Sequence, residues 1–199
     1  MPPFTQALLI ANVIAYLLQL SFPALMMQWF ALWPGGGAGL GALPLAAPWQ
    51  LITYSLLHGD IFHIAFNLFA VWMFGANLER VWGARRLAWT YVAAVISGAI
   101  AQLIVGAALG AAGGPVIGAS AGVFGILLAY ALVFPEHRIM LLIPPIPLPA
   151  RVFVALYAAL ELFLGVTGTQ AGVAHFAHLG GLLGGWLGYR NLFPGRRRR

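Results

Sequence analysis

A serine between small residues opens the fourth apolar stretch of the chain, in the run Gly118-Ala119-Ser120-Ala121-Gly122. A serine hydroxyl is a weak nucleophile that becomes reactive when a neighbouring base accepts its proton. Ser120 is predicted to begin a helix, where free backbone N–H groups and the helix dipole favour a negative charge, as on an oxyanion. The alternative is a serine that only helps helices to pack, because Ser, Gly and Ala are common where transmembrane helices meet.

His178 could supply the base. It precedes a second run of small residues, which would let its helix approach the helix of Ser120 closely. The glycines that form this small-xxx-small helix surface are Gly180, Gly181, Gly184, Gly185 and Gly188. The surface matches the small face that follows Ser120, and packing the two together would bring His178 to the serine. Ionisable residues inside membranes are rare and by default functional. The alternative for His178, and for His175 one turn earlier, is a histidine bonded to a backbone carbonyl.

His63 and Asn67 form a third polar group on another predicted helix. Their i, i+4 spacing places both side chains on one helix face, and both can donate hydrogen bonds. Such donors suit stabilisation of negative charge on a carbonyl oxygen. The alternative is a polar pair that ties helices together. Asp60 is of the right type to cap the start of this helix, and His58 is expected to be structural.

A cluster of histidines could also bind a metal ion, but the expected ligand pattern is missing. The sequence has no H-E-x-x-H motif and no carboxylate within one turn of His178. It also has no cysteine, which excludes a disulfide framework or a thiolate metal site. We therefore expect neither a metal nor a cofactor. Glu161 lies inside an apolar segment, and the sequence identifies no partner for it.

The elements that carry these residues are predicted to be membrane helices. The chain is 62% hydrophobic and 7% charged, whereas a soluble domain has about 25% charged residues. This composition predicts an all-α membrane protein with a single domain over residues 1–199. The first segment lacks the features of a cleaved signal peptide. Six segments have about the length that a bilayer requires, namely 4–22, 57–78, 87–109, 118–134, 148–165 and 172–193.

The charges predict the orientation of these segments. All ten basic residues are arginines, and they lie in every second loop and in the C-terminal tail. This pattern predicts that those loops and both termini face the cytoplasm, and it argues against a nucleic-acid partner. His63, Asn67, Ser120 and His178 then share one depth in the outer half of the membrane. Arginine without lysine favours a GC-rich bacterial genome, and hence a bacterial inner membrane.

Together these motifs resemble those of the rhomboid intramembrane serine proteases, over nearly the whole chain. The matching stretches are Pro48-Trp49, His58-x4-His63-x3-Asn67, Glu79-Arg80 followed by Gly83, Gly118-Ala119-Ser120, and Ala177-His178-Leu179-Gly180-Gly181.

The resemblance implies a six-transmembrane-helix, rhomboid-like bundle with a serine–histidine dyad and no acidic third member. Ser120 would be the nucleophile and His178 the general base, while His63 and Asn67 would form an oxyanion hole with the Ser120 backbone N–H. Phe124 would pack against the catalytic histidine, and Gly118 and His175 would support the site. The implied partners are single-span membrane proteins, cleaved near the outer end of their helix, with the fifth segment as the gate.

Two positions depart from the family pattern. Ala121 follows the serine where a glycine is frequent, and Gln50 stands where an arginine often follows the tryptophan. A non-catalytic rhomboid-like protein that binds transmembrane clients is the alternative, and the presence of all four site residues argues against it. A transporter or channel would need a polar face through the full membrane depth, whereas these polar residues cluster on the outer side.

Overall fold

The structure is a computed structural model that describes residues 1–34, 47–108, 114–141, 144–168 and 173–190. Among these residues, four helices are long and apolar enough to cross a membrane, namely α1 (Pro3–Ser21), the run Ile61–Trp82, α6 (Ala84–Ala108) and α8 (Ala150–Thr167). Multiple apolar helices of this length indicate an integral, multi-pass membrane protein.

The two remaining predicted segments form shorter helices. α7 (Ser120–Val133) has 14 residues and α9 (His175–Arg190) has 16, fewer than a full crossing requires. α7 begins directly after a turn at Gly118, which has a positive φ of 122°. The predicted extension of the sixth segment to residue 193 lies outside the described residues.

Smaller elements connect these helices. They are α2 (Pro23–Phe30), α3 (Gln50–Thr53), η2 (Tyr54–Leu56), and the antiparallel pair β1 (Arg138–Met140) and β2 (Pro147–Pro149). The run Ile61–Trp82 comprises α4 (Ile61–Ala70), a π-helical turn η3 (Val71–Gly75) and α5 (Ala76–Trp82).

Two carboxylates satisfy the free backbone N–H groups at helix starts. Asp60 accepts hydrogen bonds from the backbone of Phe62 and His63, which confirms the predicted cap of α4. Glu79 of α5 is buried and accepts from the backbone N–H groups of Phe4 and Thr5, at 2.8 and 2.7 Å. Glu79 therefore anchors the start of α1 to the middle of α5.

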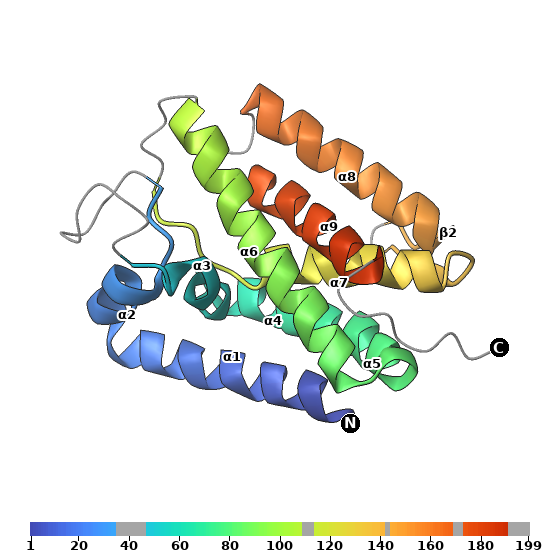
Figure 1. Cartoon of the computed structure of the whole chain (residues 1–199), viewed down its shortest axis with the longest axis horizontal. Helices are drawn as coiled ribbons and strands as arrows, with labels where there is room; N and C mark the ends of the chain where they lie inside the picture. Colours follow the sequence, from blue (N-terminus) through green and yellow to red (C-terminus); the bar gives the residue numbers. More distant parts are fainter. Residues whose placement is uncertain (35–46, 109–113, 142–143, 169–172, 191–199) are drawn as a thin grey trace.

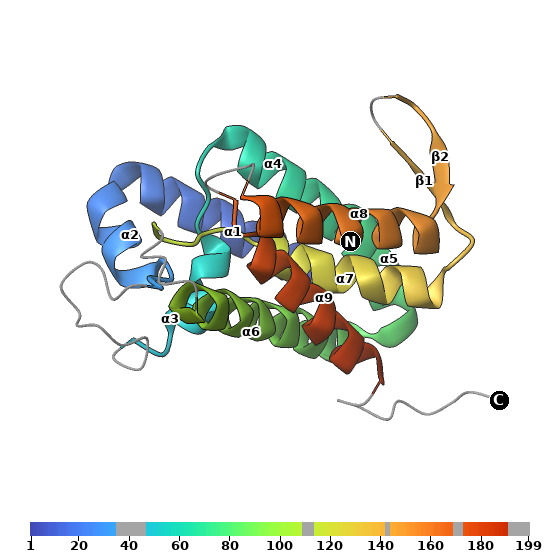
Figure 2. The same ribbon diagram turned by 90° about the horizontal axis from the view of Figure 1, so that it is seen from above.

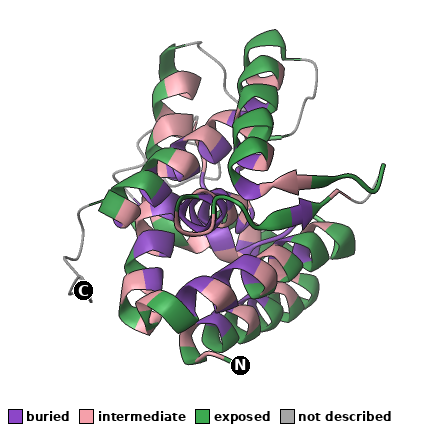
Figure 3. Cartoon of the chain, turned by 90° about the vertical axis from the view of Figure 1, so that its right-hand side faces the viewer, coloured by how far each residue is buried: buried purple, intermediate pink, exposed green. Residues whose placement is uncertain are grey.

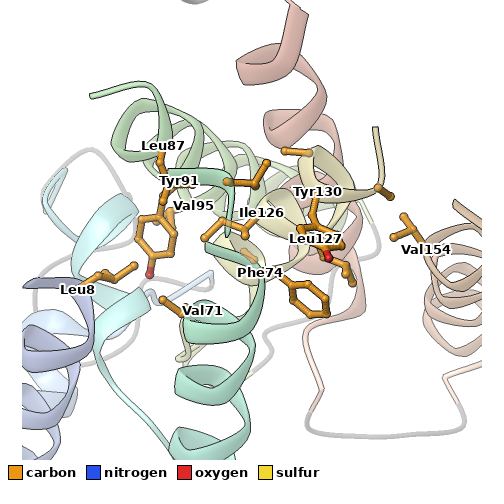
Figure 4. Close-up of a cluster of buried hydrophobic side chains, with 14 of the residues drawn as sticks. Leu8, Val71, Phe74, Leu87, Tyr91, Val95, Ile126, Leu127, Tyr130 and Val154 are labelled. Atoms are coloured by element: carbon orange, nitrogen blue, oxygen red, sulfur yellow. The ribbon is translucent and has the colours of Figure 1, made fainter. Parts of the chain in front are cut away.

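α6, α7 and α9 cross at the centre of the molecule, and α8 lies at the outside of the bundle (Figures 1 and 2). Buried residues gather where these helices meet, while the outward faces are exposed (Figure 3). The large apolar side chains of the core, including Phe74, Ile126 and Tyr130, lie between the α4–α5 run, α6 and α7 (Figure 4). On the α9 side, glycines replace large side chains, so that the helix backbones touch.

Candidate active site

Ser120 is the first residue of α7, and a turn that requires glycine sets its position. Gly118 has φ 122°, a conformation that side chains with a Cβ rarely adopt. Its N–H donates to the Tyr54 carbonyl at 2.9 Å, and the Tyr54 hydroxyl donates to the Val95 carbonyl at 2.8 Å. The turn before the serine is thus tied through η2 to α6. As the first helical residue, Ser120 has a backbone N–H without an intrahelical acceptor.

His178 reaches Ser120 because α7 and α9 approach closely. A Cβ on Gly181 would collide with the carbonyl oxygen of Ala121, so this approach requires glycine. The distance from Ser120 Oγ to His178 Nε2 is 2.7 Å. On the opposite side, the ring of Phe124 stacks on the imidazole, with centroids 4.5 Å apart and planes inclined by 10°. The imidazole is therefore held between an aromatic ring and the serine hydroxyl.

Glu161 of α8 contacts the other nitrogen of the same imidazole. Its Oε2 lies 2.9 Å from His178 Nδ1 and 2.7 Å from His175 Nδ1, and all three residues are buried. The resemblance implied no acidic member, and the sequence identified no partner for Glu161. Ser120, His178 and Glu161 in fact form a hydrogen-bonded chain across three helices. His175 contacts this carboxylate, whereas Ser120 Oγ contacts His178 Nε2 at the other end of the chain.

His63 and Asn67 bring hydrogen-bond donors to the opposite side of the serine. The Gly59 N–H donates to His63 Nδ1 at 3.2 Å, so the proton of the neutral ring is on Nε2. This Nε2 faces the Gly118 turn, where an added Cβ would lie 2.8 Å from it. Asn67 Nδ2 donates to the His63 carbonyl at 2.8 Å and keeps a second N–H. Gly118 therefore makes room for a donor beside Ser120.

His58 lies outside the membrane-spanning helices and supports His63. Its ring is fully buried and packs edge-on against the His63 ring, with centroids 5.0 Å apart. Burial, and after it the nearby His63, lower the pKa of His58 to about 4. His58 is therefore neutral at pH 7 and fills space behind the site, as expected of a structural residue.

A cavity of about 850 Å³ opens onto these groups. Its polar lining includes His63, Asn67, Ser120 and His178, and its apolar lining includes Phe124. The wall continues along α4, η3, α7 and α8 through large side chains, namely Phe66, Phe74, Leu127, Phe153 and Tyr157. The cavity is thus polar beside the serine and apolar along the helices.

The comparisons with known proteins agree with this arrangement. The model of the Rhomboid domain matches residues 46–193. The chain belongs to the rhomboid family. It is 32% identical to rhomboid protease GluP of Bacillus subtilis (strain 168) over 70% of its length, and 29% identical to rhomboid protease GlpG of Yersinia pseudotuberculosis serotype I (strain IP32953) over 93%. It is also 30% identical to Rhomboid protein 1, mitochondrial, of Saccharomyces cerevisiae (strain ATCC 204508 / S288c) over 75%.

The matches span 25%, 61% and 44% of these three relatives, in the order given. Within this rhomboid domain, five of the seven candidate residues line the cavity, namely His63, Asn67, Ser120, Phe124 and His178. Gly118 shapes the turn before the serine. His175 lies one helical turn away, against Glu161.

Sequence reasoning missed the contact of Glu161. Two signals could have found it, because the sequence had a carboxylate without a partner and a histidine, His175, without a defined role. Both lie in the predicted outer halves of consecutive apolar segments. Buried charges in membranes almost always pair, so equal depth was a reason to join them.

Proposed function

We propose that this protein is an intramembrane serine endopeptidase that uses Ser120 as nucleophile and His178 as general base. The observation that carries the proposal is the 2.7 Å contact between Ser120 Oγ and His178 Nε2 at the edge of the cavity. A nucleophile and base within hydrogen-bond reach, with the base oriented by a third group, is the arrangement that activates a serine. Membership of a family with protease members supports the same activity.

Ser120 Oγ attacks the scissile carbonyl carbon while its proton passes to His178 Nε2. The carbonyl oxygen becomes an oxyanion, which accepts hydrogen bonds from the Ser120 N–H, His63 Nε2 and Asn67 Nδ2. When the intermediate collapses, the C–N bond breaks and His178 gives its proton to the leaving amine. Water, deprotonated by His178, then hydrolyses the acyl-serine ester and restores the hydroxyl.

The proposed substrates are single-span membrane proteins, cleaved near the outer end of their helix. The apolar cavity wall suits a helix side chain or an unwound apolar segment, and the polar end suits the scissile peptide. A helical carbonyl is shielded by its own hydrogen bonds, so residues that weaken the substrate helix should promote cleavage. We assign six membrane segments with both termini in the cytoplasm of a bacterial cell, supported by the arginines in alternate loops.

The test is cleavage of a model single-span substrate in liposomes by the wild type and by Ser120→Ala and His178→Ala. We expect each substitution to reduce cleavage at least about 1000-fold, because the nucleophile and its base act as one unit. Ser21→Ala and His137→Ala are matched controls. They make the same two substitutions, serine to alanine and histidine to alanine, at residues that do not line the cavity. These controls should cleave at the wild-type rate.

Cleavage by Ser120→Ala at the wild-type rate would contradict the proposal. If no variant cleaves, a serine-reactive phosphonate separates the remaining outcomes. Labelling of the wild type, and not of Ser120→Ala, indicates an active enzyme with an unsuitable substrate. A serine that does not react indicates a rhomboid-like protein that binds transmembrane clients without cutting them.

A further inference from the structure

Glu161 is a carboxylate placed where an apolar side chain would pack. α8 is described throughout, and its buried residues are Ala150, Val154 and Glu161. The C-terminal half of α8 therefore buries a single side chain, and that side chain is a carboxylate. Its Oε2 accepts from two imidazoles of α9, at 2.7 Å from His175 and 2.9 Å from His178.

The carboxylate determines which nitrogen of His178 carries the proton. An ionised carboxylate only accepts hydrogen bonds, so His178 Nδ1 must donate to it. The neutral ring then has a lone pair on Nε2, which faces Ser120 Oγ at 2.7 Å. This is the tautomer that can accept the serine proton. In the opposite tautomer Nε2 would carry a hydrogen and could not act as the base.

Building on the proposed function, we infer that Glu161 is a positioning residue that fixes the tautomer and ring orientation of His178 and stabilises the imidazolium formed when Ser120 attacks. The site is thus a Ser120–His178–Glu161 relay. The third member lies on the helix that also forms one wall of the cavity. The orientation of the base therefore depends on α8 lying against α9.

The same three groups could be considered a metal site, because each offers one ligand atom and these atoms lie within 4.8 Å of one another. Two ligands of a tetrahedral zinc ion, each about 2.0–2.1 Å from the metal, lie roughly 3.3 Å apart. The distances of 2.7 and 2.9 Å from Glu161 to the two imidazoles are shorter and match hydrogen bonds. The geometry therefore favours the relay.

The test compares Glu161→Gln, Glu161→Asp and His175→Gln with the wild type, using the full chain in liposomes. Glutamine keeps the shape and one acceptor but loses the charge, and we expect kcat to fall about 10- to 1000-fold with KM unchanged. Aspartate keeps the charge on a shorter side chain and should restore part of kcat. His175→Gln removes the other imidazole bonded to Glu161 and leaves the contact between Glu161 and His178, so it should lower kcat less than Glu161→Gln does.

A small serine-reactive phosphonate separates a positioning role from a structural one. Unlike a transmembrane substrate, the small phosphonate does not require a helix to enter the cavity. Its rate of labelling Ser120 therefore reports on the serine and histidine alone. We expect Glu161→Gln to slow labelling by the same factor as kcat. If Glu161 only ties α8 to α9, Glu161→Gln and His175→Gln will alter KM alike and leave labelling unchanged, which would overturn the inference.

A spectroscopic readout does not depend on catalysis. In ¹⁵N-histidine NMR spectra, His178 of the wild type should show the tautomer with hydrogen on Nδ1, and Glu161→Gln should show a mixture of tautomers. If the wild type neither cleaves nor labels, the proposed function fails, and the NMR spectra still decide whether Glu161 fixes the imidazole. An identical His178 signal in both proteins would overturn that assignment.

Discussion

The two parts of the molecule that meet at His178 are held in different ways. α9 packs on α7 and α6 through glycines, and a Cβ on Gly181 or Gly185 would collide with the backbone of α7. α8 instead presents three buried residues along its whole length, one of them Glu161. Lipid is as apolar as leucine, so helices associate in membranes through close packing and polar contacts. The first region uses close packing, and the C-terminal half of α8 uses a polar contact.

In the proposed protease, this difference separates two tasks. The serine and its base must keep a fixed distance, because a displacement of about 1 Å can cost about 100-fold in rate. Backbone contact between α7 and α9 provides that precision. The wall of the cavity must admit a substrate, and a helix with few buried side chains can be displaced at low cost. The contact between Glu161 and His178 joins the two regions.

The largest effect is expected where glycine allows the α7 and α9 backbones to touch. Gly181→Ala places a Cβ against the Ala121 carbonyl, a group that cannot rotate away. We expect a loss of about 3 kcal/mol or more of unfolding free energy, at the upper end of overpacking costs. Separation of the two helices should also reduce cleavage more than about 100-fold. Thermal unfolding in detergent and cleavage in liposomes measure the two effects.

Gly165→Ala is the matched change on α8. The added Cβ would lie 3.1 Å from the His175 Cβ and 3.3 Å from the Phe176 ring, both side-chain atoms that can shift slightly. Alanine also has the better helix propensity. We therefore expect a change within about 1 kcal/mol and near-normal cleavage. Equal losses for the two variants would show that the regions are packed alike.

A smaller effect should appear in acid, on the side of the site where His58 is buried. Its pKa is lowered to about 4, first by burial and then by His63, against the opposing effects of the Leu56 backbone and Asp60. Between pH 6.5 and 4 the unfolded chain binds a proton that the folded chain excludes, so stability falls as pH falls through this window. The loss by pH 4 is on the order of 2–3 kcal/mol.

Replacement of the titrating ring tests this dependence. His58→Phe should show a smaller loss of thermal stability between pH 7 and pH 4.5 than the wild type. His137→Phe, at an exposed position near β1, is the control and should follow the wild type. If His58→Phe and the wild type lose stability equally, the acid sensitivity arises elsewhere.

Much of the active site follows from residue types and membrane depth. Ser120, His178, His63 and Asn67 were predicted to share one depth, and the structure brings them to one cavity. The spacing of the glycines after His178 predicted the close approach of α7 and α9. The grouping at one cavity and the close approach of the helices could be predicted because small residues and buried polar groups have few uses inside a membrane.

Other features could not be predicted because they depend on contacts distant in sequence. Glu79 belonged to a motif without an assigned purpose, and its carboxylate caps α1, more than 70 residues earlier in the chain. An unpartnered carboxylate and an unassigned histidine indicated that Glu161 could pair with α9, but its 2.9 Å contact with His178 depends on how closely α8 lies against α9. The start of α7 also depends on the turn at Gly118, which is tied to Tyr54 by a hydrogen bond between residues far apart in sequence.

The smallest effects are expected from substitutions of the aromatic residues near His178, one on α7 and one on α8. Phe124 of α7 stacks on the imidazole, and Tyr157 of α8 contacts Phe124 with centroids 4.9 Å apart. Phe124→Leu should lower kcat about tenfold, near the upper limit of an aromatic pair, and Tyr157→Leu about threefold or less. If Tyr157 acts through Phe124, the double variant will cleave no more slowly than Phe124→Leu alone. A Tyr157→Leu effect as large as that of Phe124→Leu would mean that α8 positions the base as strongly as α7 does.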